Sequence, residues 1–253
     1  MKTKTIISRL LILVVAITTM AMTNVKTVEP VSKSVEVTFK KSKLIEVAFL
    51  SIDPNKIQQL NEEYFKKVMP IAKEYGMKPL ASMSVQYSYS ETVNPQMVGF
   101  YEWESKEKHE AFLKDPRFLK IKPIRDSALT YLKLGYFIVE NDTKVTFKTG
   151  ELMEIYAMWL NTSEAHRMQT YFKNVMPLIT GEGNQYDVKF PLALNSQNYG
   201  ADSYQPQSFG IAIWKNKASN TQFFTSKAYD NIKSDKDAAI ERLDVWQGEI
   251  IIN

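Results

Sequence analysis

Apolar residues recur along the chain with two different periods, and these predict strands and helices in a fixed order. Residues 44–52 are apolar and β-prone, which predicts a strand. Asp53-Pro54 then supplies a helix N-cap followed by proline at the first helical position. The helix that follows extends to about Tyr75, and Gly76 ends it.

The next 60 residues complete the first half of the pattern. Alternation predicts strands over 80–89 and 97–103, separated by a turn at Asn94-Pro95. Ser105 caps a second helix, Asp115-Pro116 begins another helical turn, and residues 131–139 read as a fourth strand. The order is therefore strand, helix, strand, strand, helix, strand.

The same order returns in the second half, and part of the sequence returns with it. The heptapeptide 64–70, Tyr-Phe-Lys-Lys-Val-Met-Pro, recurs at 171–177 with six of seven positions identical. Both copies place a proline inside the predicted helix, at Pro70 and Pro177, where it removes one hydrogen bond and kinks the axis. The corresponding second-half elements are expected at 151–160, 163–180, 186–194, 207–214, 217–232 and 242–252. The repeat indicates a tandem duplication.

This order is typical of the ferredoxin-like arrangement, so the fold class is α+β. Each copy would form a four-stranded antiparallel sheet with helices on one face only. The bare face needs a partner to bury it, and the second copy supplies one. We expect two modules, at 44–140 and 151–253, joined by a polar linker at 141–150 and closed into one intramolecular barrel. Such a pseudo-dimer has no need of further assembly, so we expect a monomer.

The N-terminus indicates export. Lys2, Lys4 and Arg9 precede an apolar run over 10–16 and then small residues, the pattern of a signal peptide, which we place at 1–23. That run is too short to span a membrane, no later segment is long enough, and residues 24–43 read as a tether or loose strand. We expect a soluble periplasmic or secreted protein.

Charge and cysteine content exclude some partners and some kinds of covalent attachment. Without residues 1–21 the net charge falls from +4 to +1, and the remaining Lys and Arg are scattered, which argues against a nucleic-acid partner. The chain has no cysteine, so neither a disulfide nor a lipid-anchored cysteine is available.

Two stretches of the first module resemble a known group of proteins. Residues 99–105, Gly-Phe-Tyr-Glu-Trp-Glu-Ser, and residues 115–128, which begin Asp-Pro-Arg-Phe-Leu, resemble a domain-of-unknown-function family in the dimeric α/β barrel superfamily. The resemblance covers about 44–140. That superfamily includes antibiotic biosynthesis monooxygenases, haem-degrading monooxygenases, muconolactone isomerases and chlorite dismutases. The resemblance therefore implies the barrel fold, while a function taken from fold alone is analogy.

Glu102 and Arg125 are the candidate catalytic residues. A carboxylate within an apolar strand and an arginine after the last short helix are expected to meet near the barrel end, where they would hold a small anion or tune a proton-transfer group. A purely structural ion pair is the alternative. The second copy has Ile213 in place of Glu102 and lacks the stretch around Arg125, so we expect any functional site in the first copy.

Aromatic residues are candidates for a ligand cavity. Trp103 and Trp214, with Tyr101, end the third strands, where the monooxygenase relatives place an aromatic residue that lines the substrate cavity. Tyr64 and Tyr171 on the kinked helices are further candidates. The alternative is an ordinary core position, because each aromatic side chain buries about 150–250 Å².

Glu46 and Glu154 are carboxylates at equivalent places in the two first strands. Facing the shared interior, they would form a paired acid site, and burial would raise at least one pKa. The alternation of Ile45, Val47 and Phe49 equally allows them to point away, and we expect them to be exposed to solvent.

Cofactor chemistry finds no support in the sequence. His109 and His166 lie near helix starts at non-equivalent places, and neither matches the helix histidine of the haem-degrading relatives, whose region here reads 119–122. Ligand clusters for a metal, a phosphate loop, a dinucleotide fingerprint and a nucleophile elbow are also missing from the sequence. We expect no cofactor and no metal.

Three functions fit these observations. The first is an exported protein that binds a small, partly apolar or aromatic molecule between sheet and kinked helix. The second is a cofactor-independent monooxygenase or isomerase with a general base such as Glu102. The third is a structural module without a ligand.

Overall fold

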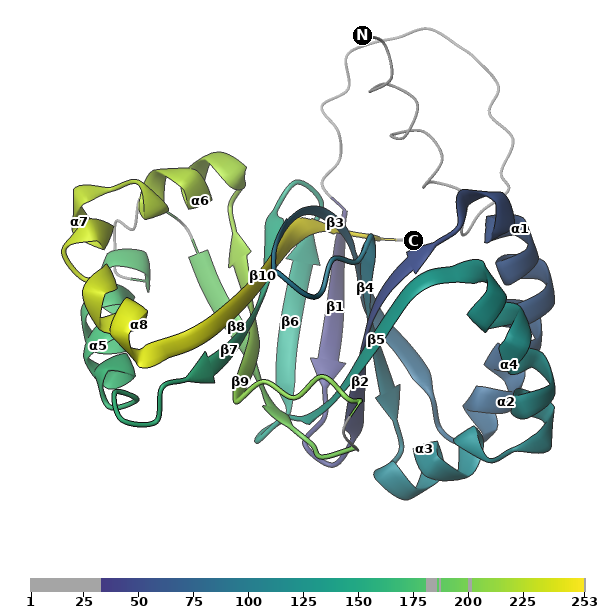
Figure 1. The fold of residues 1–253 in the computed structure, drawn as a ribbon. Coiled ribbons are helices and arrows are strands. Elements are labelled where there is room, and N and C mark those ends of the chain that lie inside the picture. The colour runs from purple at the N-terminus through teal and green to yellow at the C-terminus, as the bar shows by residue number, and fades with distance from the viewer. Residues whose placement is uncertain (1–32, 181–185, 187, 200–201, 253) are drawn as a thin grey trace, which may run out of the picture.

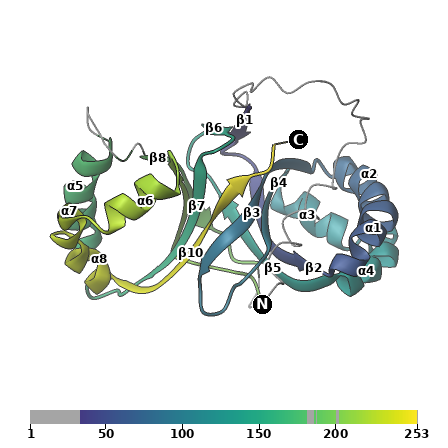
Figure 2. The ribbon, with the colours of Figure 1, turned by 90° about the horizontal axis from the view of Figure 1, so that it is seen from above.

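The computed structural model describes residues 33–180, 186, 188–199 and 202–252 (Figure 1). The proposed signal peptide lies outside the described residues. The two halves of the chain have the same order of elements, and their helices lie on opposite sides of a central set of strands (Figure 2). No helix within the described ranges is long and apolar enough to cross a membrane.

The first half follows the predicted order closely. Its strands are β2 (Leu44–Ile52), β3 (Lys78–Tyr89), β4 (Met97–Trp103) and β5 (Leu129–Ile138). Its helices are α1 (Ile57–Gln59), α2 (Lys66–Glu74), α3 (Lys106–Leu113) and α4 (Pro116–Ala128), with a 3₁₀ turn at Pro54–Lys56 and a π-helical turn at Leu60–Phe65. The side chains of Asp53, Ser105 and Asp115 accept hydrogen bonds from backbone N–H groups at the three predicted N-caps. Gly76 has the positive φ of 78° expected where the helix ends.

The second half repeats this order with small shifts at the element ends. Its strands are β7 (Leu152–Leu160), β8 (Val188–Ser196), β9 (Ser208–Trp214) and β10 (Ile240–Ile250). Its helices are α5 (Arg167–Thr180), α6 (Lys217–Phe224), α7 (Lys227–Asp230) and α8 (Lys233–Ala239). Pro70 and Pro177 lie inside α2 and α5, as predicted.

The eight strands form a closed barrel in the order β10-β3-β4-β2-β5-β8-β9-β7. Within it, β3-β4-β2-β5 and β8-β9-β7-β10 are the two four-stranded antiparallel sets. The two junctions between them differ greatly in length. β10 pairs with β3 over six residue pairs, whereas β5 pairs with β8 at only two.

A two-stranded sheet accompanies the barrel, built from segments for which we expected a tether and a linker. β1 (Ser34–Phe39) pairs antiparallel with β6 (Thr143–Lys148) along its whole length. Phe39 and Phe147 are buried in the same apolar cluster as the inward-facing barrel residues Phe49 and Trp246, and Phe39 lies edge-on to Phe100. Side chains therefore fill the barrel centre.

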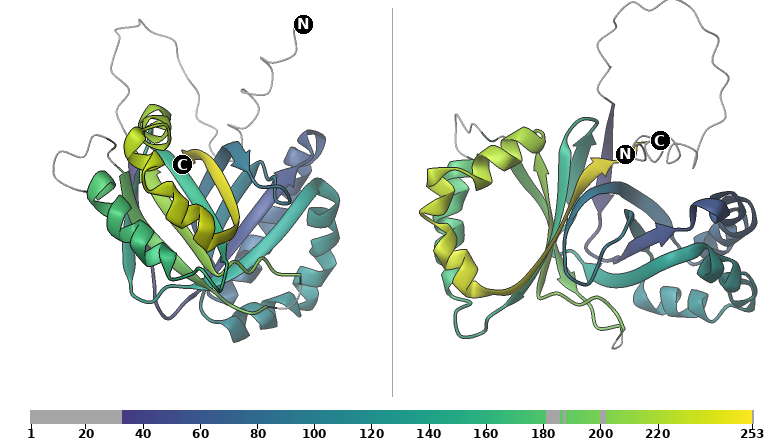
Figure 3. Two further views of the ribbon diagram at one scale, coloured as in Figure 1. Left: turned by 60° about the vertical axis from the view of Figure 1, so that its left-hand side comes forward. Right: turned by 45° about the horizontal axis from the view of Figure 1, so that its top comes forward.

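The helices cover the outer faces of the two sheets (Figure 3). α1–α4 enclose one apolar cluster that includes Trp103, and α5–α8 enclose another that includes Trp214. Both faces of each sheet are thus covered, one by the barrel interior and one by helices.

Each half also sends a loop across to the other. Val93, in the loop after β3, accepts a hydrogen bond from Trp246 Nε1 at 2.8 Å. In the opposite direction, Tyr204, in the loop after β8, pairs with Gly135 and donates from its hydroxyl to Asp244 at 2.6 Å. The halves are thus joined by loops as well as by the two strand junctions.

Candidate functional site

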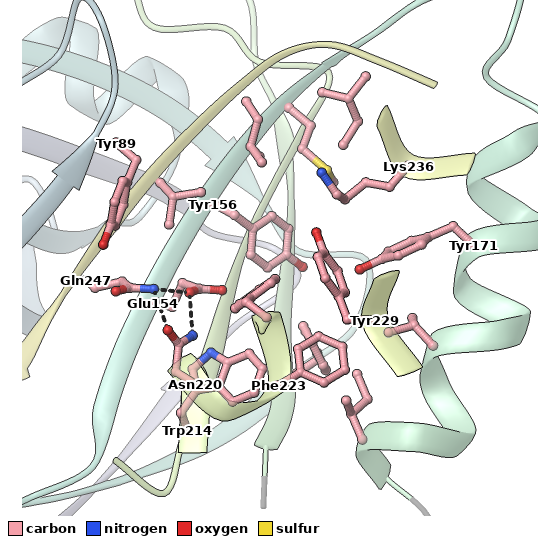
Figure 4. Close-up of a pocket in the computed structure, with 18 of the residues that line it drawn as sticks. Tyr89, Glu154, Tyr156, Tyr171, Trp214, Asn220, Phe223, Tyr229, Lys236 and Gln247 are labelled. Carbon is pink, nitrogen blue, oxygen red and sulfur yellow. Dashed lines mark hydrogen bonds between the residues drawn. The ribbon is translucent and has the colours of Figure 1, made fainter. Parts of the chain in front are cut away.

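Each half contains a cavity between its sheet and its helices. The cavity of the second half has a volume of about 450 Å³ and lies between β7, β9 and β10 on one side and α5–α8 on the other (Figure 4). The cavity of the first half has about 110 Å³ and lies under α2–α4. We name them the second cavity and the first cavity. We expected any site to lie in the first half, but the larger cavity lies in the second.

The strand register places corresponding side chains in the two cavities. Leu44 lies opposite Trp103, and Leu152 lies opposite Trp214. Glu46 and Glu154, two residues further along, therefore both face the helices, with neighbours such as Ile45 facing the barrel interior. The prediction that these glutamates are exposed is wrong, because Glu154 is 7% exposed and the side chain of Glu46 is 14% exposed. They form no paired acid site either, since they line separate cavities.

In the second cavity, Glu154 is held by two amide side chains. Oε2 of Glu154 accepts a hydrogen bond from Asn220 Nδ2 at 3.1 Å and another from Gln247 Nε2, and Gln247 Nε2 also donates to Asn220 Oδ1 at 3.2 Å. Figure 4 shows the other carboxyl oxygen directed into the cavity. Burial raises the pKa of Glu154, because the hydrogen bonds from Gln247 and Asn220 and the charge of Lys217 only partly offset the cost of desolvating its ionised form.

Trp214 places an indole N–H beside this carboxyl group. It is 1% exposed, and its buried Nε1 makes no hydrogen bond of standard geometry among the described residues. The indole N–H still acts weakly on Glu154 as a donor, because it lowers the pKa of that carboxyl group against the larger effect of burial. A buried donor without an acceptor costs about 1–3 kcal/mol, and a ligand oxygen would recover it.

Tyrosine hydroxyls and a lysine add further donors. Tyr156, Tyr171, Tyr229 and Lys236 all line the second cavity, and Figure 4 shows the three hydroxyls directed towards its centre. Burial raises the pKa of Tyr156 to about 12 and also raises that of Tyr171, so both stay protonated at neutral pH. The Tyr156 hydroxyl lies over Gly210, where a Cβ would collide with it and with the Leu192 carbonyl oxygen 2.7 Å away.

In the first cavity, the corresponding carboxyl group has different partners. Oε2 of Glu46 accepts a hydrogen bond from Trp103 Nε1 at 3.2 Å and lies 3.1 Å from His109 Nε2. His109 is 1% exposed, and its Nδ1 lies 2.7 Å from the Tyr199 hydroxyl, which belongs to the loop after β8. The Tyr199 ring stacks on Tyr136 with centroids 3.9 Å apart. A residue of the second half thus completes the polar network of the first cavity.

Glu102 and Arg125 are not brought together. Glu102 is 2% exposed and pairs with Lys78 Nζ at 3.4 Å, on the face of β4 opposite to Trp103. Arg125 lines the first cavity, on the Trp103 side of the sheet, and pairs with Asp126 at 2.7 Å. Adjacent strand residues point to opposite faces, so the barrel wall separates Glu102 from Arg125. Their assignment as catalytic residues stays a prediction.

The aromatic candidates lie where a ligand would contact them. Tyr64, Tyr101 and Trp103 line the first cavity, and Tyr171 and Trp214 line the second. Burial raises the pKa of Tyr64 to about 12, although Arg125 nearby lowers it, and burial also raises the pKa of Tyr101.

Three residues of the second cavity are not among the residues that the sequence predicted. Asn220, Gln247 and Lys236 lie 111 positions after His109, Tyr136 and Arg125, the offset that relates Trp103 to Trp214. Applying that offset along both halves would have predicted all three. Lys236 lines the second cavity, so a cation lies there at the place that Arg125 has in the first.

The donor set gives no support to a metal site. Within the described ranges, no three His, Cys, Asp or Glu side chains gather as ligands for a metal ion. The described lining of the second cavity includes neither histidine nor cysteine, so this cavity does not offer the imidazole or thiolate that most often holds a haem iron.

Comparison with known proteins identifies the fold. No family model matches the sequence, and no curated protein is significantly similar to it. Among solved structures, an anthrone oxidase-like protein is similar with a TM-score of 0.53 and 12% identity, over 86% of this chain and 94% of that one. A mutant chlorite dismutase from Candidatus Nitrospira defluvii is similar with a TM-score of 0.52 and 10% identity, over 84% and 92%.

These similarities, together with the strand order, confirm the predicted fold. The chain has the α+β fold of the dimeric α/β barrel proteins, with ferredoxin-like sets of four antiparallel strands. Identities near 10% establish the fold alone.

Proposed function

We propose that this protein binds a small, partly apolar or aromatic molecule in the second cavity. The observation that carries the proposal is the buried Nε1 of Trp214, without a hydrogen bond of standard geometry, beside the carboxyl group of Glu154 in a mostly apolar cavity of about 450 Å³. Ligand sites are typically mostly apolar cavities of about 300–1,000 Å³ with a few well-placed polar groups. A purely structural module has no need for a cavity of this size.

The walls of the second cavity suit a flat ring system. Tyr156 and Trp214 come from the sheet side, and Tyr171, Phe223 and Tyr229 come from the helices. Phe223 already makes ring contacts with Trp214 and Tyr229 at centroid distances of 5.6 and 5.2 Å. An aromatic ligand would extend this cluster, with its oxygen atoms towards Trp214 and Glu154.

A second candidate function is cofactor-independent oxygenation or isomerisation of such a ligand. It is favoured by the raised pKa of Glu154, because a carboxylate with a raised pKa is a stronger base once ionised. The carboxyl oxygen directed into the cavity would accept a proton from the ligand. A solved neighbour described as anthrone oxidase-like agrees with this candidate.

The setting of this function is also a proposal. We propose that residues 1–23 direct export, that the mature protein acts in the periplasm or outside the cell, and that it works as a monomer. We propose further that the two halves arose by tandem duplication. The common register of β2–β4 and β7–β9 and the matching strand order support this history.

A thermal-shift screen of the mature chain against aromatic acids, quinones and haem tests the binding function. At least one aromatic compound is expected to raise the melting temperature and to bind measurably by calorimetry. Trp214→Phe is expected to weaken that binding about two- to tenfold, the effect of one hydrogen bond. Trp103→Phe, the matched change in the first cavity, is expected to leave it unchanged. Uniformly flat shifts would leave only the structural module.

A further inference from the structure

Exposed aromatic side chains concentrate at the second cavity. Six large hydrophobic residues within the described part of the chain are exposed, and four of them line this cavity. Three are phenylalanines from three different elements: Phe172 of α5, Phe190 of β8 and Phe224 of α6, with exposures of 42%, 38% and 38%. We name these three the apolar rim. Large exposed apolar groups that gather at one place mark a binding surface.

The fold itself does not require this rim. Phe65 matches Phe172 in the repeated heptapeptide, and Leu113 stands at the place of Phe224. Both first-half residues are half-buried, whereas their counterparts in the second half are exposed. The first cavity is also covered, because Tyr199 stacks over Tyr136 beside it. At the places of Phe172 and Phe224 the same scaffold thus partly covers an apolar side chain in the first half.

The rim and the buried polar groups belong to one continuous cavity. Glu154 and Trp214 are almost completely buried, whereas Phe172, Phe190 and Phe224 line the same cavity and reach solvent. Phe224 of the rim lies against Trp214, with ring centroids 5.6 Å apart, so the exposed apolar surface begins beside the buried indole. A ligand that matches both kinds of group has a polar head and an apolar chain.

We infer that the ligand of the second cavity is an amphiphile, with an oxygen-bearing head at Trp214 and Glu154 and an apolar chain that lies along the rim. This inference rests on the proposed binding function and adds the class of ligand. A compact aromatic molecule held at Trp214 and Glu154 would leave Phe172 and Phe190 exposed. An amphiphile removes both the unpaired indole donor and the exposed phenylalanine surface.

A homologous series of 4-alkylphenols, from 4-ethylphenol to 4-octylphenol, tests the inference by calorimetry on the mature chain. Affinity is expected to rise by up to about fourfold per added methylene, and to keep rising for the longest members, because each methylene leaves water. In Phe190→Ser and Phe172→Ser the rise is expected to stop at the longer chains. Binding of 4-ethylphenol by these variants is expected to match the unsubstituted protein.

A matched control uses another exposed apolar residue. Leu119 is 50% exposed and does not line the second cavity, so Leu119→Ser is expected to leave the whole series unchanged. Trp214→Phe is expected to weaken all members by a similar factor, because every member shares the phenol head.

The outcomes separate the two proposals. If the short phenols bind and the long ones bind no more tightly, the amphiphile inference is wrong and the binding function stands. Equal losses in the rim variants for short and long members would also overturn the inference. If no phenol binds and the screen above is flat as well, both proposals fail.

Discussion

The two cavities share a scaffold and differ in what holds their carboxyl group. In the first, Trp103 and His109 both contact Oε2 of Glu46. In the second, Asn220 and Gln247 hold Glu154, and the indole N–H of Trp214 is left without a partner. The first cavity also receives Tyr199 from the other half and encloses about 110 Å³, against about 450 Å³ for the second. The same fold thus leaves the indole N–H of Trp214 available to a ligand once amide side chains, instead of the tryptophan and a histidine, hold the carboxyl group.

Alanine substitutions at Gly99 and Gly210, which stand at equivalent places in the two halves, are expected to differ most in their cost in free energy of unfolding. A Cβ at Gly210 would meet the Tyr156 hydroxyl and, at 2.7 Å, the Leu192 carbonyl oxygen, whereas the atoms nearest to one at Gly99 belong to the Tyr101 side chain, at 3.0 Å. Backbone cannot move aside as a ring can. Gly210→Ala is expected to cost about 3 kcal/mol in free energy of unfolding and Gly99→Ala about 1 kcal/mol. Equal losses in free energy of unfolding, measured by urea denaturation, would contradict this prediction.

Replacing the histidine of the first cavity is expected to have the next largest effect. His109→Ala removes the contacts to Glu46 and Tyr199 and is expected to cost about 2 kcal/mol, the range for hydrogen bonds to charged groups. His109→Asn introduces the residue that the second half has at this place and should recover part of the loss. His166→Ala, at the exposed second histidine, is the control and should change the free energy of unfolding by less than about 0.5 kcal/mol. No recovery by asparagine would contradict the correspondence of the two clusters.

The raised pKa of Glu154 predicts that the free energy of unfolding depends on pH through this residue of the second cavity. Folding favours the protonated form, so the stabilisation is complete below the unfolded pKa of about 4.3 and is lost as pH rises through the higher folded pKa. Compared with Glu154→Gln, the unsubstituted protein is expected to lose about 1.4 kcal/mol per pH unit across that window. Denaturation curves measured from pH 4 upward test this. Parallel curves for the two proteins would contradict it, and Glu63→Gln on the exposed surface of the first half is the control.

The loops that cross between the halves give the smallest expected effects. Tyr199→Phe removes the hydroxyl 2.7 Å from His109 Nδ1 and keeps the stacked ring, so it is expected to cost about 1 kcal/mol. Tyr89→Phe is the counterpart, because Tyr89, the last residue of β3, lines the second cavity from the first half and its hydroxyl lies 3.5 Å from Lys217 Nζ. It should cost less than Tyr199→Phe in the same measurement. The reverse order would mean that the second cavity is the more tightly closed one.

Most of the fold was predictable because its signals are local. The strands at 44–52 and 97–103 have the predicted bounds, and the caps at Asp53, Ser105 and Asp115 lie where the sequence places them. The pairing of β1 with β6 was not predictable from local pattern. Its partners lie more than 100 residues apart, and both segments are short and polar on alternate positions.

The candidate site was harder to predict, since both faces of each sheet are covered. Alternation along β2 separates Ile45 from Glu46, but it does not tell which face meets the barrel interior and which meets helices. Glu46 and Glu154 were therefore expected in solvent, and Glu102 was expected beside Arg125 although the sheet separates them. The helix residues His109 and Asn220 carry no periodic signal, because one polar residue on an apolar helix face resembles many others.

The two-stranded sheet of β1 and β6 has a consequence for folding during synthesis. Both strands precede residue 149, so this sheet is available before β8 and β10 exist to pair with the free edges of β5 and β3. Phe39 and Phe147 contribute to the apolar cluster at the barrel centre, and Phe39 contacts Phe100 of the first sheet. A growing chain that ends near residue 149 can thus cover part of the inner face of its first sheet with β1 and β6. These two strands would act as an internal substitute for the second half until synthesis supplies it.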